Sequence, residues 1–199
     1  MTPIDFYFDF SSPYGYLASL RIDALAAAHG ASVTWRPFLL GAVFRITGQS
    51  PLTEQPMRGE YARRDFARSA RLMGAPFTLP ARFPVATQAA ARAFYWLAER
   101  DAIAAKRLAR ALYHAYFAEG RDISPAETVV AIAKDQGIDA AALTAALGDP
   151  AVKQRLKAET EAAIQRGVFG SPFVFVGDEP FWGADRLDQV ARWLTTGGW

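Results

Sequence analysis

The hydrophobic pattern of this 199-residue chain predicts two strands near its start. Residues 4–10 form an aromatic, apolar run between Pro3 and Ser11, which is typical of a short buried strand. Residues 13–29 have a helical pattern that ends before Gly30, and residues 32–38 alternate as a second strand does. A strand, a helix and a strand joined at these lengths predict a parallel pair with a right-handed crossover.

The strand pattern then stops until residue 173. We expect a loop with a short helical piece over 41–53, a polar, Arg-rich helix over 56–73 and a Pro-punctuated loop over 75–84. Successive helices are predicted over 87–100, 102–118, 125–136, 140–147 and 150–166.

Strand character returns at residues 173–176, and after a turn over 177–179 residues 181–182 complete a hairpin. The hydrophobic pattern of residues 184–195 predicts a final amphipathic helix. The order βαβ, helical block, ββα predicts an α/β fold with a large all-helical insertion. We expect one domain from residues 1–40 and 160–199, and an inserted helical domain from 41–159.

Composition restricts the possible functions. Hydrophobic residues make up 51% and charged residues 21%, as in ordinary globular proteins, and the net charge is only +2. The densest basic stretch, over residues 63–71, is diluted by Asp65 and reads as a solvated helix face. We therefore expect no nucleic-acid partner.

The chain contains no cysteine, and its two histidines, His29 and His114, lack a metal-binding spacing. Structural disulfides and dithiol redox chemistry by this chain are therefore excluded, and we expect no metal site. No apolar stretch approaches the roughly 18 residues of a membrane span, and Asp5 and Asp9 interrupt any secretory pattern at the start. We expect a cytoplasmic protein without a membrane partner.

Two local features indicate a site. Ser12 stands between the first strand and the first helix, and Pro13 follows it. Serine before proline is a good helix N-cap, and the free N–H groups there stabilise an anion, including a thiolate. Without cysteine, such a thiolate must come with a ligand. The second feature is Ser171-Pro172 directly before a strand, where local sequence alone favours an ordinary trans proline.

Together the two features resemble the thioredoxin-like fold of bacterial disulfide oxidoreductases, whose Cys-Pro-x-Cys motif is replaced here by Ser12-Pro13-Tyr14-Gly15. Over essentially its whole length the chain is similar to the 2-hydroxychromene-2-carboxylate isomerases and their kappa-class glutathione transferase relatives. The resemblance rests on residues 6–18, 36–41, Tyr61-x-x-x-Asp65, 168–172 and 182–187.

The resemblance implies glutathione as cofactor and Ser12 as the catalytic residue, whose hydroxyl hydrogen-bonds the glutathione sulfur. A cis Ser171-Pro172 bond would present the backbone of Ser171 to the cysteinyl part, and Asp185 would hold the α-ammonium group. Without the family context, Asp185 is equally a carboxylate favoured at a helix N-terminus, and Arg186 equally a surface pair. The glutathione-binding residues implied in this way are Ser12, Gln49, Arg58, Ser171, Pro172, Trp182, Gly183, Ala184, Asp185 and Arg186.

Three of these positions depart from the family pattern. Gln49 replaces a common Asn, Arg58 a common Lys, and Ala184 an amide side chain, so glutathione affinity or substrate choice is expected to differ. A pocket for the second substrate is expected between the sheet and the helical insertion, although aromatic residues at such spacings are more often core. Its candidate residues are Tyr14, Phe38, Phe44, Arg45, Arg82 and Phe83.

The resemblance therefore implies a glutathione-dependent isomerase that interconverts 2-hydroxychromene-2-carboxylate and trans-o-hydroxybenzylidenepyruvate, or close analogues, in aromatic-compound catabolism. It also implies reversible thiolate addition to a conjugated carbon, with glutathione released unconsumed, and a homodimer. Two alternatives stay open. One is a kappa-like transferase that consumes glutathione, and the other is a non-catalytic glutathione or peptide binder.

Overall fold

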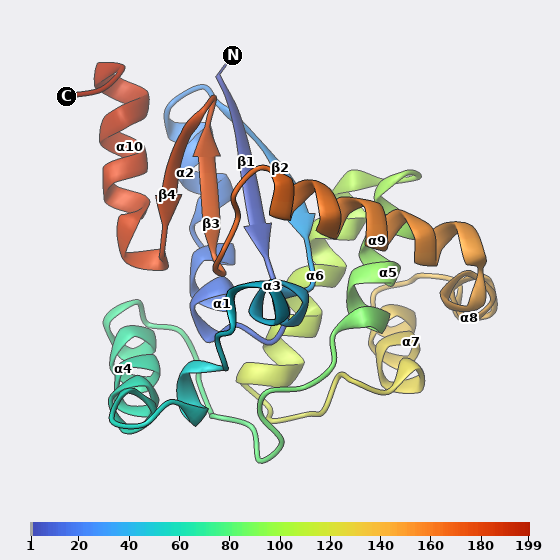
Figure 1. Ribbon diagram of the computed structural model, residues 1–199. Coiled ribbons are helices and arrows are strands. Elements are labelled where there is room, and N and C mark those ends of the chain that lie inside the picture. Colours follow the sequence, from blue (N-terminus) through green and yellow to red (C-terminus); the bar gives the residue numbers. More distant parts are fainter. Residues whose placement is uncertain (1) are drawn as a thin grey trace.

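The computed structural model describes residues 2–199 and contains a four-stranded sheet flanked by helices (Figure 1). The strands lie in the order β2-β1-β3-β4. Their bounds are β1 (Pro3–Phe8), β2 (Ser32–Pro37), β3 (Phe173–Val176) and β4 (Glu179–Trp182). β1 and β2 are parallel, whereas β3 runs antiparallel to both β1 and β4. The predicted parallel pair and C-terminal hairpin are confirmed.

The predicted single helix over residues 13–29 is wrong in one respect, because the structure divides it into α1 (Pro13–Ser19) and α2 (Ile22–Ala28). Leu17 and Ile22 are both fully buried. On one continuous helix their side chains would point about 140° apart, since successive residues turn by roughly 100°. The break between them lets both side chains reach the core.

The remaining helices lie within a few residues of their predicted ranges. They are α3 (Leu40–Thr47), η1 (Leu52–Glu54), α4 (Arg58–Leu72), α5 (Gln88–Ala98), α6 (Ala102–Phe117), α7 (Ala126–Asp135), α8 (Ala140–Gly148), α9 (Pro150–Gln165), η2 (Ala184–Arg186) and α10 (Leu187–Thr196). Within residues 2–199, no helix has both the length and the apolar character that crossing a membrane requires.

Aromatic side chains form the centre of the main core. Phe8 and Phe10 of the first strand region contact Tyr113 of α6 at ring-centroid distances of 5.8 and 5.2 Å. Each fully buried ring of this kind contributes on the order of 1.5–3 kcal/mol. This core continues from the sheet into helices α5–α8. The expected domain boundary at residues 159 and 160 falls inside α9, so the division into two domains stays a prediction.

One edge of the sheet collects the chain segments that carry the candidate site. β1 and β4 both end at this edge and β3 begins there, at the bottom of the sheet in Figure 1, while α4 lies beyond it. The loop that leads into α1, the segment before β3 and the turn that follows β4 therefore meet in space.

Candidate active site

Ser12 is the N-cap of α1, as its sequence context predicts. Its Oγ accepts a hydrogen bond from the N–H of Gly15 at 3.0 Å, and Pro13 occupies the first helical position. Its own N–H donates to the carbonyl of Asp9 at 2.9 Å. These bonds fix the hydroxyl at the N-terminus of α1, where Ser12 is only 6% exposed.

Ser12 is also bonded to the second predicted feature, 159 residues away. Its hydroxyl donates to the carbonyl oxygen of Ser171 at 2.7 Å. The Ser171-Pro172 peptide bond is cis, as the family resemblance implies, so the trans form favoured by local sequence is wrong. The hydroxyl of Ser171 accepts the N–H of Asp9 at 2.9 Å, which completes a small buried network.

The neighbouring Ser11 has a different function. Its Oγ accepts the N–H of Val85 at 3.0 Å and so holds the loop that precedes α5. Ser12, and not Ser11, is therefore the serine that connects to Ser171.

Asp9 is buried beneath this network, a role that the sequence analysis missed. Its carboxylate accepts the N–H of Ser11 and of Leu40, both at 2.8 Å, and the hydroxyl of Thr87 at 3.2 Å. Burial raises the pKa of Asp9 above its ordinary value, although all three donors act in the opposite direction. Asp9 thus joins the α1 entry loop to the starts of α3 and α5. The available signal was an acidic residue inside an apolar, aromatic run.

Gly15 stands at the last position of the four-residue motif. A Cβ atom there would lie 2.6 Å from the hydroxyl oxygen of Tyr113 and 3.0 Å from the Oγ of Ser171. The Tyr113 hydroxyl is fully buried and donates to the carbonyl of Asp9 at 2.9 Å, so it has little freedom to move. The space that a second cysteine would need is therefore occupied by tyrosine.

The segment after β4 lies beside the cis proline. The N–H of Gly183 donates to the carbonyl of Pro172 at 3.1 Å, and Gly183 has a φ of 115°, which favours glycine. Ala184 begins η2, which packs against α1. The Asp185 side chain is 73% exposed and pairs with Arg186 at 3.4 Å. Surface pairing, one of the two roles considered for Arg186, is therefore present, and contact with a ligand stays a prediction.

Tyr14 connects α1 to α4. Its hydroxyl donates to the carboxylate of Asp65, which also accepts a hydrogen bond from Arg68, and its ring packs edge-on against Phe66 at 5.1 Å. Burial, and then the bond to Asp65, raise the pKa of Tyr14. The negative charge of Asp185 raises this pKa further. Tyr14 is thus held at the side of the site that faces α4.

Arg58 begins α4 after an unusual turn. Met57 has a φ of 63°, and the N–H of Arg58 donates to the carbonyl of Pro56 at 2.7 Å. This is the geometry of a classic γ-turn, which is rare and strained. The guanidinium of Arg58 donates to Gln55 at 3.3 Å, and Gln49 is exposed in the loop after α3.

Among the aromatic substrate candidates, Phe38 requires a correction. Phe38 is 1% exposed and packs edge-on against Tyr7 in the smaller core cluster, so its ring does not face a surface ligand. Phe83 is half-buried and packs against Phe66 at 6.2 Å. Phe44 is half-buried on α3.

The two basic substrate candidates differ in their pairing. Arg82, in the loop before α5, forms an ion pair with Asp122 at 2.8 Å. Arg45 lies exposed in the last turn of α3. Of the two, Arg82 is already engaged by a carboxylate within the protein.

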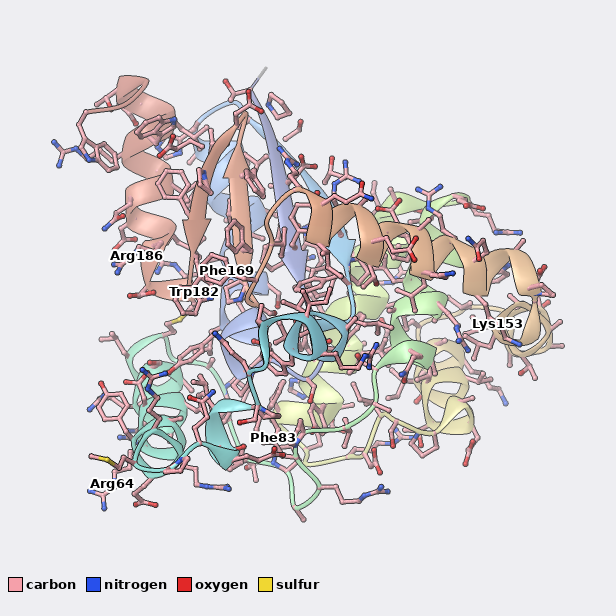
Figure 2. The ribbon with its side chains drawn as sticks, in the orientation of Figure 1. Arg64, Phe83, Lys153, Phe169, Trp182 and Arg186 are labelled. Atoms are coloured by element: carbon pink, nitrogen blue, oxygen red, sulfur yellow. The ribbon has the colours of Figure 1, made fainter. Side chains whose placement is uncertain are left out.

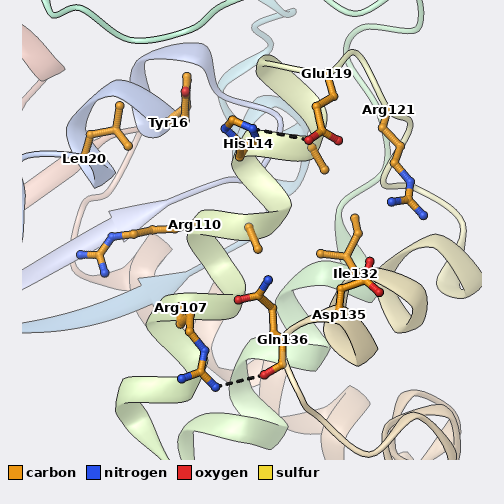
Figure 3. Close-up of a pocket in the computed structure, with 12 residues that line it drawn as sticks. Tyr16, Leu20, Arg107, Arg110, His114, Glu119, Arg121, Ile132, Asp135 and Gln136 are labelled. Atoms are coloured by element: carbon orange, nitrogen blue, oxygen red, sulfur yellow. Dashed lines mark hydrogen bonds and ion pairs between the residues drawn. The ribbon is translucent and has the colours of Figure 1, made fainter.

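Ser12 lines neither of two open cavities. One of about 470 Å³ lies between α1, α6 and α7, with Arg107, Arg110 and His114 on its wall (Figure 3). The other, of about 450 Å³, lies between β4 and α10 and includes Trp182 and Arg186. Over the described residues 2–199, no three metal-ligating side chains come together. The network of Ser12, Ser171 and Asp9 is therefore the best supported site.

Comparison with known proteins agrees with this geometry. Residues 3–195 match the DSBA-like thioredoxin domain. A 2-hydroxychromene-2-carboxylate isomerase of Sphingobium xenophagum is 33% identical over 193 residues, which cover 96% of this chain and 97% of that protein. Glutathione S-transferase kappa 2 of Caenorhabditis elegans is 28% identical, with 96% of this chain and 91% of that protein covered.

A solved structure of a 2-hydroxychromene-2-carboxylate isomerase superposes on this chain with a TM-score of 0.86. The two are 31% identical, and the superposition covers 97% of this chain and 94% of the other. The predicted thioredoxin-like α/β fold with a helical insertion is therefore confirmed.

Proposed function

Because the chain belongs to the DSBA-like thioredoxin domain family, and within it to the group of 2-hydroxychromene-2-carboxylate isomerases and kappa-class glutathione transferases, we propose that it is a glutathione-dependent isomerase. Its proposed reaction interconverts 2-hydroxychromene-2-carboxylate and trans-o-hydroxybenzylidenepyruvate, or close analogues of the two. The observation that supports this most directly is the buried bond between Ser12 and Ser171 in a chain without cysteine.

The residues at this site fit a peptide thiol. The Ser12 hydroxyl at the start of α1 suits a thiolate, and the backbone of Ser171, which precedes the cis proline, suits an amide. The exposed Asp185 carboxylate suits an ammonium group. Glutathione, when bound, supplies the nucleophilic thiolate that this chain lacks.

In the proposed reaction, each of the protein's own groups has a separate role. Ser12 holds the thiolate form by donating a hydrogen bond, and Ser171 orients the ligand backbone. Asp9 acts behind them, because it fixes the loop that carries Ser12 and its N–H holds the Ser171 hydroxyl. Arg58 and Arg45 are the basic groups proposed for carboxylates of glutathione and of the substrate.

The test is the rate of chromene ring opening followed by absorbance, with and without glutathione. We expect turnover that requires glutathione in catalytic amount and leaves the total thiol concentration unchanged. Turnover of equal rate without glutathione would refute the cofactor, and no turnover of any chromene carboxylate would refute the reaction.

The kappa-class relatives favour transfer of glutathione to a small electrophile as the second candidate function. With 1-chloro-2,4-dinitrobenzene as electrophile, stoichiometric loss of thiol would support this alternative. A third possibility, non-catalytic binding, predicts a calorimetric signal for glutathione or a peptide without turnover of either kind of substrate.

The proposal also includes cytoplasmic location and a homodimer, both carried by the family resemblance. Light scattering on the purified protein tests the assembly. The expected mass is twice that of the 21.8 kDa chain.

A further inference from the structure

Two large aromatic side chains stand side by side at the surface next to the candidate site. Phe169 is 44% exposed and Trp182 is 56% exposed. Their ring centroids lie 4.9 Å apart in an edge-to-face arrangement, and Figure 2 shows them adjacent at the lower end of the β3–β4 hairpin. We call Phe169, Gly170 and Trp182 the aromatic ledge.

The ledge is held in place from below. A Cβ on Gly170 would lie 2.1 Å from the Nε1 of Trp182, so the indole lies directly against the glycine backbone. Phe169 packs edge-on against the buried Phe173 at 5.1 Å. Both rings therefore have defined orientations although a large part of each faces solvent.

The ledge is also tied to the backbone of the site. Gly170 immediately precedes Ser171, whose carbonyl accepts the Ser12 hydroxyl. Gly183 directly follows Trp182 in the chain, and its N–H donates to the carbonyl of Pro172. The two rings are therefore joined through the backbone to the residues proposed to bind the thiol ligand.

Basic charge adjoins the apolar surface. Trp182 and Arg186 line the same hollow of about 450 Å³, and both are labelled in Figure 2. The Arg186 guanidinium is 47% exposed and pairs with Asp185 at 3.4 Å, so a ligand carboxylate at Arg186 would compete with Asp185. An aromatic surface beside a guanidinium suits a planar ring that carries a carboxylate. A stable protein interface would bury at least about 1,000 Å², far more than two rings provide.

We infer that the aromatic ledge binds the planar ring of the second substrate, an aryl carboxylate, and that Phe169 determines specificity for that ring. This assignment rests on the proposed function and moves the substrate ring from the buried Phe38 to the rim beside Ser171. It also replaces Arg45 by Arg186 as the partner of the substrate carboxylate. Edge-to-face contact with one ring is consistent with an approximately fivefold to tenfold effect on affinity.

The experiment measures ligand binding by calorimetry, independently of turnover. The probes are 2-naphthoate for the aryl carboxylate and S-methylglutathione for the thiol site, since neither reacts. We expect Phe169→Ala to weaken the binding of 2-naphthoate about fivefold to tenfold. Phe169→Tyr, which keeps the aromatic ring, should bind 2-naphthoate as tightly as the unmodified protein does. S-methylglutathione affinity should stay the same in both variants.

Trp199→Ala is the matched control, because Trp199 is an exposed aromatic residue that lines the hollow but not the ledge. Circular dichroism verifies that each variant is folded. Unchanged 2-naphthoate affinity in folded Phe169→Ala, an equal loss in Trp199→Ala, or no 2-naphthoate binding by the unmodified protein would each overturn the inference. If Phe169→Ala weakens S-methylglutathione equally, the ledge belongs to the thiol site and the inference also fails.

Failure of the proposed function gives a different result. The unmodified protein would then not bind S-methylglutathione, whereas 2-naphthoate binding that depends on Phe169 would still support the ledge.

Discussion

The hydroxyl of Ser12 donates its single hydrogen to the carbonyl of Ser171, at 2.7 Å and in a buried position. The same hydrogen cannot simultaneously serve a ligand sulfur. In the proposed function Ser12 donates to a thiolate instead, and the Ser171 carbonyl then needs another donor. A cysteinyl N–H near the thiol would supply it, so we expect thiol binding to be coupled to recognition of the adjacent amide.

The first prediction is that thiols without an amide N–H bind poorly. An unpaired buried carbonyl costs about 1–3 kcal/mol, which corresponds to roughly fivefold or more in affinity. In competition with S-methylglutathione, N-acetylcysteine should therefore bind at least fivefold more tightly than 3-mercaptopropionate, which also carries one carboxylate. Equal affinities for the two would show that the Ser171 carbonyl does not select the ligand.

The second prediction compares Ser12 with its neighbour. Ser12→Ala removes the donor to the sulfur, so the pKa of bound glutathione should rise and turnover should fall at least tenfold. A titration of thiolate absorbance reports the pKa. Ser11→Ala is the matched control, because Ser11 accepts from Val85 and does not bond to Ser171. An unchanged thiol pKa in Ser12→Ala would remove Ser12 from this role.

The third prediction concerns the buried carboxylate of Asp9. Asp9→Asn replaces one acceptor oxygen by an NH₂ group that must face an existing donor, from Leu40 on one side or Ser11 and Thr87 on the other. We expect a loss of about 1–3 kcal/mol in the free energy of unfolding, measured with urea.

Asp101→Asn is the control for the same chemical change. Asp101 caps α6 by accepting the N–H groups of Ile103 and Ala104, and asparagine caps helices about as well as aspartate. Equal losses in the two variants would contradict the special role of Asp9.

Local signals were sufficient to predict most of the elements. The Ser12-Pro13 cap is set by residues adjacent in sequence, and the apolar run of β3 is bounded by proline and glycine. The break between α1 and α2 was missed because it depends on where Leu17 and Ile22 find the core, which is a tertiary effect.

The site was predictable only in part. Family resemblance, and not local sequence, indicated the cis Ser171-Pro172 bond that the structure contains. The hydrogen bonds that the Asp9 carboxylate accepts come from segments up to 78 residues away, so no nearby pattern could reveal them. Phenylalanine is common both in ligand pockets and in the core, so the residue type of Phe38 could not distinguish the two. Its 1% exposure in the structure identifies it as a core residue.

The final prediction is a pH dependence of stability that arises from Asp5. Its carboxylate accepts from Arg36 at 2.7 Å and from Arg166 at 2.5 Å. Burial alone would raise the pKa of Asp5, but the hydrogen bonds from Arg166 and Arg36 outweigh it and lower the pKa. A carboxyl group with a lowered folded-state pKa stabilises the protein above its unfolded pKa of about 3.9. That stabilisation is lost as the pH falls through the folded-state value.

Arg166→Met tests this pair while keeping most of the packing over Phe175, whose ring lies 3.9 Å from the guanidinium carbon. We expect a loss of about 1–3 kcal/mol at pH 7, because Arg166 also donates to the carbonyl of Gly177. The loss should shrink in urea unfolding at pH 3, which lies below the unfolded-state pKa of about 3.9, because the stabilisation from Asp5 decreases there. Arg64→Met, which removes an exposed pair with Glu60, should cost at most about 0.5 kcal/mol at pH 7. A loss for Arg166→Met that is the same at both pH values would show that Asp5 does not carry the pH dependence.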